Sequence, residues 1–118
     1  MTTLISLCIG AASGALAAVF GVGGGIVMVP SFVTLLGLSQ KAASATSLAA
    51  IIVIAMAGTF KNQTNGLIDW RVTVPSAIGG CLVAWLAADM LKYMSNELLS
   101  RGFACLLIFM GIRMLLTK

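Results

Sequence analysis

The chain of 118 residues is 60% hydrophobic and 8% charged, with a net charge of +4. A soluble domain averages about 25% charged residues, so this composition excludes a water-soluble fold and predicts an all-α integral membrane protein of the cell membrane. The basic residues are scattered singly near the ends of apolar segments, which excludes a nucleic-acid surface and is typical of membrane interfaces.

The first forty residues carry no charge and contain two apolar segments. Residues 4–20 are small and apolar, and they predict a helix that packs closely on its neighbours, with Gly10 and Gly14 as a GxxxG pair. No basic residue precedes this segment, so it does not match a cleaved signal peptide. Residues 26–38 would form a helix of only about 20 Å, shorter than a bilayer core of roughly 30 Å. They predict a half-helix or a re-entrant segment.

Four glycines separate these two segments: Gly21, Gly23, Gly24 and Gly25. We call residues 21–25 the glycine break. Glycine weakens a helix by roughly 1 kcal/mol relative to alanine, and the nearby Pro30 by about 3 kcal/mol. The helix is therefore expected to end here. Because lipid cannot satisfy the exposed backbone, the glycine break should face protein or a watery cavity, where ions and small substrates bind in membrane proteins.

Three further apolar segments are predicted to cross the bilayer: residues 40–60, 72–91 and 98–116. Ser39 is the expected N-cap of the first segment, and residues 61–69 are the expected turn after it. Pro75 is expected in the first turn of the second segment, where a missing N–H does little harm. Asp89 and Lys92 lie three residues apart near its end and are expected to pair.

Two topologies are compatible with this pattern. If residues 4–20 and 26–38 form a hairpin, three full crossings follow and the chain ends lie on opposite sides. If they form one broken helix, there are four crossings and the ends share a side. Both topologies place Lys41, Lys92 and Arg101 on one side, and Lys61, Arg71, Arg113 and Lys118 on the other. This near balance gives no preferred orientation and is what a protein that inserts both ways shows.

Five short motifs follow one another along the chain: GVGGGIVMVP at 21–30, ATSL at 45–48, GLIDWR at 66–71, RGFA at 101–104 and GIRML at 111–115. In this order and spacing they resemble the sulfite exporter TauE/SafE family. The resemblance covers nearly the whole chain and implies a multi-pass transporter of a small anion such as sulfite, thiosulfate or an organosulfonate. Family members usually carry two such repeats, whereas residues 1–118 match one membrane domain of a single repeat. We therefore expect a dimer with itself or a similar half-length protein, antiparallel if the number of crossings is odd.

The expected anion site lies at the start of the helix after the glycine break. Backbone N–H groups there lie at the positive end of a helix dipole and can hold an anion without a cation in the membrane. A tight turn between packed helices is the alternative role of the glycines. Hydroxyl groups on the next helix can donate to anion oxygens or bond to their own backbone. The candidate substrate-binding residues are Gly21, Gly23, Gly24, Gly25, Ile26, Thr46 and Ser47, with Cys81, Cys105 and Arg113 as secondary candidates.

The remaining chemistry of the chain argues against catalysis. There is no histidine, and the three cysteines have neither zinc-site nor redox spacing, so we expect no metal and no cofactor. Paired carboxylates and an activated nucleophile are also missing, so an enzyme is not expected. The leading hypothesis is a membrane transporter that exports a small anion as a dimer of repeats. The alternative is a non-transporting membrane subunit that assembles with or regulates another membrane protein.

Overall fold

The computed structural model describes residues 1–117, which form five α-helices and no strand. The helices are α1 (Thr2–Phe20), α2 (Gly25–Leu36), α3 (Gln40–Thr64), α4 (Trp70–Met90) and α5 (Asn96–Leu116). Four of them, α1, α3, α4 and α5, are long and apolar enough to cross a membrane, and α2 is shorter. The predicted all-α, multi-pass membrane fold is confirmed.

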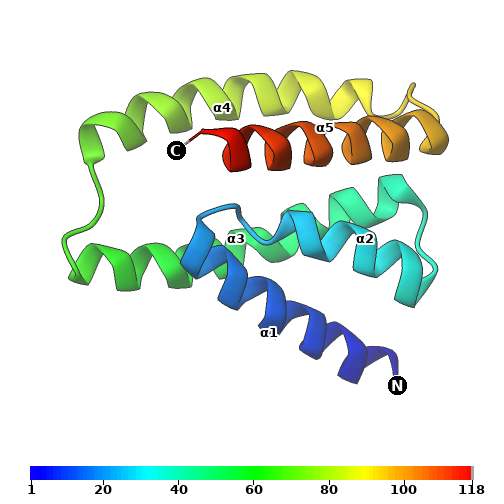
Figure 1. Cartoon of the computed structure of the whole chain (residues 1–118), viewed down its shortest axis with the longest axis horizontal. Helices are drawn as coiled ribbons and strands as arrows, with labels where there is room; N and C mark the ends of the chain where they lie inside the picture. The colour runs from blue at the N-terminus through cyan, green and yellow to red at the C-terminus, as the bar shows by residue number, and fades with distance from the viewer. Residues whose placement is uncertain (118) are drawn as a thin grey trace.

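The first two helices form a hairpin. α1 and α2 run side by side in opposite directions, and α2 returns the chain to the end where α1 began (Figure 1). From there α3, α4 and α5 each run the length of the molecule, so that Met1 and the end of α5 lie at opposite ends (Figure 1). The structure therefore has the hairpin arrangement, in which α1 and α2 leave and return to one end and the three long helices α3, α4 and α5 follow (Figure 1).

Side-chain caps and a left-handed glycine set several helix ends. Ser39 caps α3, because its Oγ accepts a hydrogen bond from the N–H of Ala42 at 3.3 Å, as predicted. Ser95 caps α5 in the same way, with its Oγ 3.2 Å from the nitrogen of Leu98. Gly37 ends α2 at φ +66°, a conformation that favours glycine. Local sequence chemistry therefore explains these boundaries.

The end of α3 differs from the sequence prediction. The helix continues to Thr64 instead of stopping at Phe60, and the turn is confined to the residues around Gly66, which has φ +67°. A side-chain hydrogen bond from Trp70 Nε1 to Gln63 Oε1, 2.9 Å long, joins this last turn of α3 to the start of α4. Polar residues here remain helical because the end of a membrane helix meets water, where they are easily solvated.

The start of α4 also corrects a prediction. The carboxylate of Asp69 accepts a hydrogen bond from the N–H of Arg71 at 2.9 Å, and this cap begins the helix at Trp70. Pro75 is therefore the sixth residue of α4 and lies in its second turn, not its first. Its missing N–H leaves the carbonyl of Arg71 without the usual helical partner.

Packing is concentrated in the first three helices. Every buried hydrophobic residue among residues 1–117 lies in α1, α2 or α3: Ile9, Met28, Val29, Phe32 and Ala43. No residue of α4 or α5 is buried. α5 meets α3 along one stretch, where Phe103 packs against the buried core. We call α1–α3 the packed unit and α4–α5 the open hairpin.

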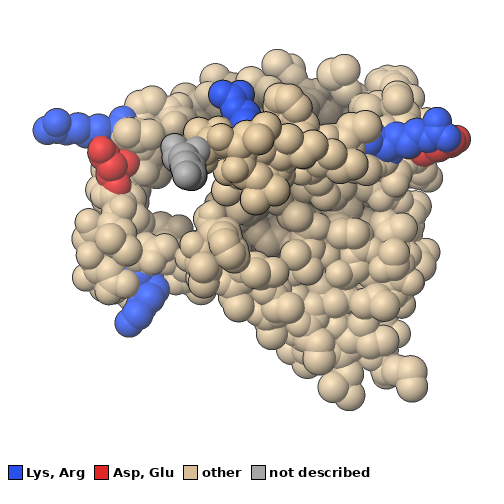
Figure 2. Space-filling model, in the orientation of Figure 1, with Lys and Arg blue, Asp and Glu red and all other residues tan. Residues whose placement is uncertain are grey.

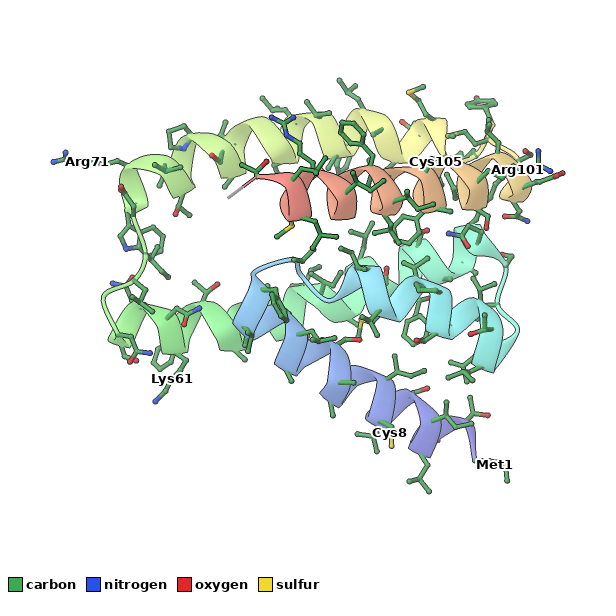
Figure 3. All side chains as sticks on the ribbon, in the orientation of Figure 1. Met1, Cys8, Lys61, Arg71, Arg101 and Cys105 are labelled. Carbon is green, nitrogen blue, oxygen red and sulfur yellow. The ribbon has the colours of Figure 1, made fainter. Side chains whose placement is uncertain are left out.

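Most charged side chains lie at two opposite ends of the molecule, with mainly uncharged surface between them (Figure 2). Arg101 lies at the end that also holds Met1, and Lys61 and Arg71 lie at the other (Figure 3). At the first end, Lys92 forms the predicted ion pair with Asp89 at 3.0 Å. This separation is the one expected of a protein whose middle lies in lipid.

Candidate functional site

The glycine break is confirmed as an interruption of the helix. α1 ends at Phe20, and Gly21 follows in a left-handed conformation with φ +68°. Gly23 and Gly24 also have positive φ values, +73° and +71°. Three left-handed residues within four positions require glycine, because a β-carbon makes this conformation unfavourable.

The glycine break lies halfway along α3. A β-carbon built on Gly23 would stand 3.9 Å from Cγ2 of Ile51, and one on Gly25 would stand 3.3 Å from its Cδ1. Ile51 is the twelfth of the 25 residues of α3, a helix of about 37 Å. Since α3 runs the length of the molecule, the glycine break lies about halfway between the two ends of the molecule.

The N-terminus of α2 opens directly from the glycine break. The carbonyl of Gly24 accepts the first helical hydrogen bonds, from the nitrogens of Val27 at 3.1 Å and Met28 at 3.0 Å. The N–H groups of Gly25 and Ile26 precede these bonds, and no side chain of residues 1–117 caps this end of the helix. With its twelve residues, α2 carries about half a positive charge at this end. Both N–H groups can therefore serve as anion donors.

Ser13 of α1 lies against the N-cap of α2. A β-carbon on Gly24 would stand 3.0 Å from the backbone oxygen of Ser13 and 3.2 Å from its Cβ. Ser13 is 0% exposed, and its hydroxyl has no hydrogen-bond partner among the residues that the structure describes. Sequence reasoning missed this residue, whose only signal is a hydroxyl within a run of small apolar residues. Position 24 therefore needs glycine both for its φ and for this close approach.

A groove of about 510 Å³ leads from the glycine break along the second half of α3. Its walls are formed by the end of α1, by the glycine break itself and by α3: Gly14, Ala17, Ala18, Gly21, Gly23, Ile54, Ala55, Ala57, Gly58, Thr59 and Asn62. Thr59 and Asn62 supply hydrogen-bonding side chains, and sequence reasoning missed both. Their spacing from Ala55, four and seven residues, places all three on one helical face and could have revealed them.

Of the two candidate hydroxyls on α3, only Ser47 is buried. Its Oγ donates to the carbonyl of Ser44 at 2.8 Å, so its proton is used within its own helix. Ser47 lies one turn from Ile51, the residue that contacts the glycine break. Thr46 is exposed and is not brought to the glycine break.

The secondary candidates lie on the open hairpin. Cys81 on α4 and Cys105 and Arg113 on α5 are all exposed. None of the three lines the groove beside the glycine break, and Figure 3 shows Cys105 on α5, away from α1 and α2. The structure therefore does not bring these residues together with the glycines within the described chain.

A protein-family model for the sulfite exporter TauE/SafE matches residues 1–118. The chain belongs to the TauE/SafE family. This membership confirms the resemblance in the short motifs, and it identifies the chain as part of a family of membrane transporters, which are not enzymes. A multi-pass location in the membrane agrees with the apolar helices of this TauE/SafE chain.

Three curated relatives are similar to this TauE/SafE chain over almost its full length. A "Probable membrane transporter protein" of Haemophilus influenzae is 31% identical over 99% of the chain and 48% of the relative. YunE of Bacillus subtilis, also a "Probable membrane transporter protein", is 26% identical over 94% of the chain and 41% of its own length. A "Probable membrane transporter protein" of Xylella fastidiosa is 27% identical over 94% of the chain and 42% of the relative. The chain thus spans less than half of these relatives. No solved structure gives a significant match.

Proposed function

We propose that this TauE/SafE repeat exports a small oxyanion, such as sulfite or an organosulfonate, by binding it at the start of α2. The observation that carries the proposal is the uncapped N-terminus of a twelve-residue helix at about mid-depth of α3. The N–H groups of Gly25 and Ile26 point to an anion because they are donors at the positive end of the helix dipole. Gly21, Gly23 and Gly24 let the ligand approach the backbone.

The chain's charge distribution supports an uncharged binding site. Most of its charged side chains lie at the two ends of the molecule, so the middle offers peptide dipoles in place of formal cations (Figure 2). The groove reaches the glycine break at Gly21 and Gly23, and Thr59 and Asn62 can donate hydrogen bonds to an anion moving along it. Weak, successive polar contacts of this kind suit passage better than one tight site.

A second repeat would complete the pathway. The groove is open, and the apolar faces of α4 and α5 lie uncovered. With three full crossings, a second repeat related by inversion would run antiparallel to the first. It would be another copy of this chain, a similar half-length protein or a further segment of a longer chain. Rocking of the two repeats about the bound anion would then expose it to each side in turn.

Sulfite flux from liposomes that contain only this polypeptide tests the proposal. Liposomes that contain the protein and are loaded with sulfite under nitrogen should release sulfite faster than protein-free liposomes. In liposomes loaded with chloride, the protein should not speed the release of chloride to the same extent. Thiosulfate and methanesulfonate complete the panel. If a correctly assembled oligomer releases none of the three, the transport proposal fails.

Assembly with another membrane protein is the second candidate function. The uncovered apolar faces of α4 and α5 favour it, because such faces pack against partner helices as readily as against lipid. The same liposome experiment separates the two functions. A stable complex with a different membrane protein, together with no flux from the isolated polypeptide, would favour a non-transporting subunit.

The orientation of the chain tests the antiparallel pairing. Because the basic residues are nearly balanced between the two ends, we expect a chain that inserts in both orientations. Reporter proteins fused to the C-terminus should then be active on both sides of the membrane. A single fixed side would contradict antiparallel pairing of identical copies.

A further inference from the structure

The hydroxyl of Ser13 differs from that of Ser47, the other buried serine, and from exposed hydroxyls that are bonded within their helices. Ser6 donates to the carbonyl of Thr2 at 2.9 Å, Thr34 to that of Pro30 at 2.8 Å, and Ser47 to that of Ser44 at 2.8 Å. Ser13 is more deeply buried than any of these, yet its Oγ has no partner among the described residues. Buried polar groups are nearly always hydrogen-bonded, so an unpartnered one calls for an explanation.

The position of Ser13 suggests what the hydroxyl is for. Its side chain packs on Gly24, the N-cap residue of α2, and its Cβ lies 3.2 Å from where a β-carbon of Gly24 would stand. The free N–H groups of Gly25 and Ile26 are the next two along the chain. The N-cap of α2 and the residue that carries the unpartnered hydroxyl thus lie against each other, contributed by two different helices.

We propose that the Ser13 hydroxyl is a further ligand of the transported anion, acting together with the N–H groups of Gly25 and Ile26. This inference rests on the proposed function and deepens it. Donors from α1 and α2 suit an oxyanion with several acceptor oxygens, such as sulfite or a sulfonate, over a spherical halide. Because Ser13 is fully enclosed, contact requires the glycine break to shift away from α1. Its glycines permit such a shift, since they have no side chains to repack.

Comparison of Ser13→Ala with Ser6→Ala tests the assignment. Both variants remove a hydroxyl from α1, but the Ser6 hydroxyl is bonded within its helix. Ser13→Ala should raise the KM for sulfite flux about tenfold, equivalent to about 1.4 kcal/mol of lost binding free energy. It should also reduce the sulfite-induced rise in melting temperature. Without anion, its melting temperature should equal or exceed that of the wild type, because an unpartnered buried hydroxyl is removed. Ser6→Ala should keep the wild-type KM.

A more conservative variant tests the same position with a weaker donor. Ser13→Cys keeps a weak donor of similar shape, and its KM should fall between those of the wild type and Ser13→Ala. A wild-type KM and wild-type sulfite-induced stabilisation in both variants would overturn the inference alone. A loss of stability in Ser13→Ala without anion would also overturn it, because the hydroxyl would then serve the fold. If the wild type neither binds nor moves sulfite, thiosulfate or methanesulfonate, the proposed function fails as well.

Discussion

The packed unit and the open hairpin are built from helices of similar apolar character, yet only one of them has a core. α1 and α3 each bury part of their surface, whereas no residue of α4 or α5 is buried. All four helices are long and apolar enough to cross a membrane. Apolar character therefore predicts which segments enter lipid but not which segments pack on one another.

The glycines of the two regions show where the difference arises. In the packed unit, Gly14 faces Ile54, Gly25 faces Ile51, and Gly24 lies against Ser13. In the open hairpin, the β-carbon positions of Gly79, Gly80, Gly102 and Gly111 all lack a contact within 4 Å from another described helix, as do those of Gly10 and Gly58 in the packed unit. Small residues allow membrane helices to approach closely, so those of the hairpin are available to a partner that the packed unit does not supply.

The largest expected effect comes from Gly24→Leu. The new side chain would need φ +71° and would overlap the backbone of Ser13, so the glycine break could not keep its shape. Sulfite flux should be abolished while membrane insertion, which depends on the apolar helices, is kept. Flux from liposomes and extraction with alkaline carbonate measure the two properties. Gly79→Leu in α4, which meets open space, should keep both insertion and wild-type monomer stability. Undiminished flux in Gly24→Leu would remove the glycine break from the mechanism.

Two matched phenylalanine truncations compare the packing of the regions directly. Phe32 in α2 is 5% exposed, and Phe32→Ala should lower the free energy of unfolding by about 3 kcal/mol. Phe109 in α5 is 63% exposed, so Phe109→Ala should change the monomer little. Unfolding in detergent micelles gives both values. A loss in Phe109→Ala that appears only at protein concentrations where dimers form would place this face in the interface.

The left-handed glycines allow a finer test within the packed unit. Gly21→Ala should cost about 1–2 kcal/mol, the penalty for a β-carbon at positive φ, because nothing described lies within 4 Å of it. Gly24→Ala should cost more, because its β-carbon would also stand 3.0 Å from the oxygen of Ser13. Thermal unfolding of both variants gives the order. An equal loss of stability in Gly21→Ala and Gly24→Ala would mean that α1 and α2 separate easily at Ser13.

The smallest effect concerns the link between the two regions. The Oδ1 of Asn96, at the start of α5, accepts a hydrogen bond from the N–H of Lys41 at 3.3 Å and so helps to cap α3. Lys41 also donates through Nζ to the carbonyl of Lys92 at 3.1 Å. Asn96→Ala should cost about 1 kcal/mol and speed hydrogen exchange at the amide of Lys41. Ser95→Ala removes the cap of α5 instead and should leave exchange at Lys41 unchanged. An equal rate of hydrogen exchange at the amide of Lys41 in both variants would contradict the link between Asn96 and the start of α3.

Much of the fold was predictable because it depends on local chemistry. The glycine break, the Ser39 cap and the pairing of Asp89 with Lys92 each follow from residues close together in the chain, and all three are confirmed. The predictions for the end of α3 and for the helical turn that holds Pro75 were wrong, because polar residues at the edge of a bilayer suit helix and turn equally well.

Less of the candidate site was predictable, because it depends on contacts between helices. The sequence contained no sign that Ser13 would face Gly24, since residues of α1 and α2 meet only after the hairpin closes. Thr59 and Asn62 share a helical face, but only the placement of α1 shows which face lines the groove. For Ser47, one residue type allowed two hydrogen-bonding roles, and the structure shows the bond within its own helix.

The order of the packed helices has a consequence for biosynthesis. α1, α2 and α3 are consecutive, so the packed unit is complete once Thr64 has left the ribosome. Short loops between these neighbours make their assembly fast relative to chain elongation. The packed unit would then begin to assemble while α4 and α5 are still being made and inserted. Nascent α4 and α5 would emerge with the stretch of α5 beside α3 as their main contact with that module, and so would be free to capture another polypeptide.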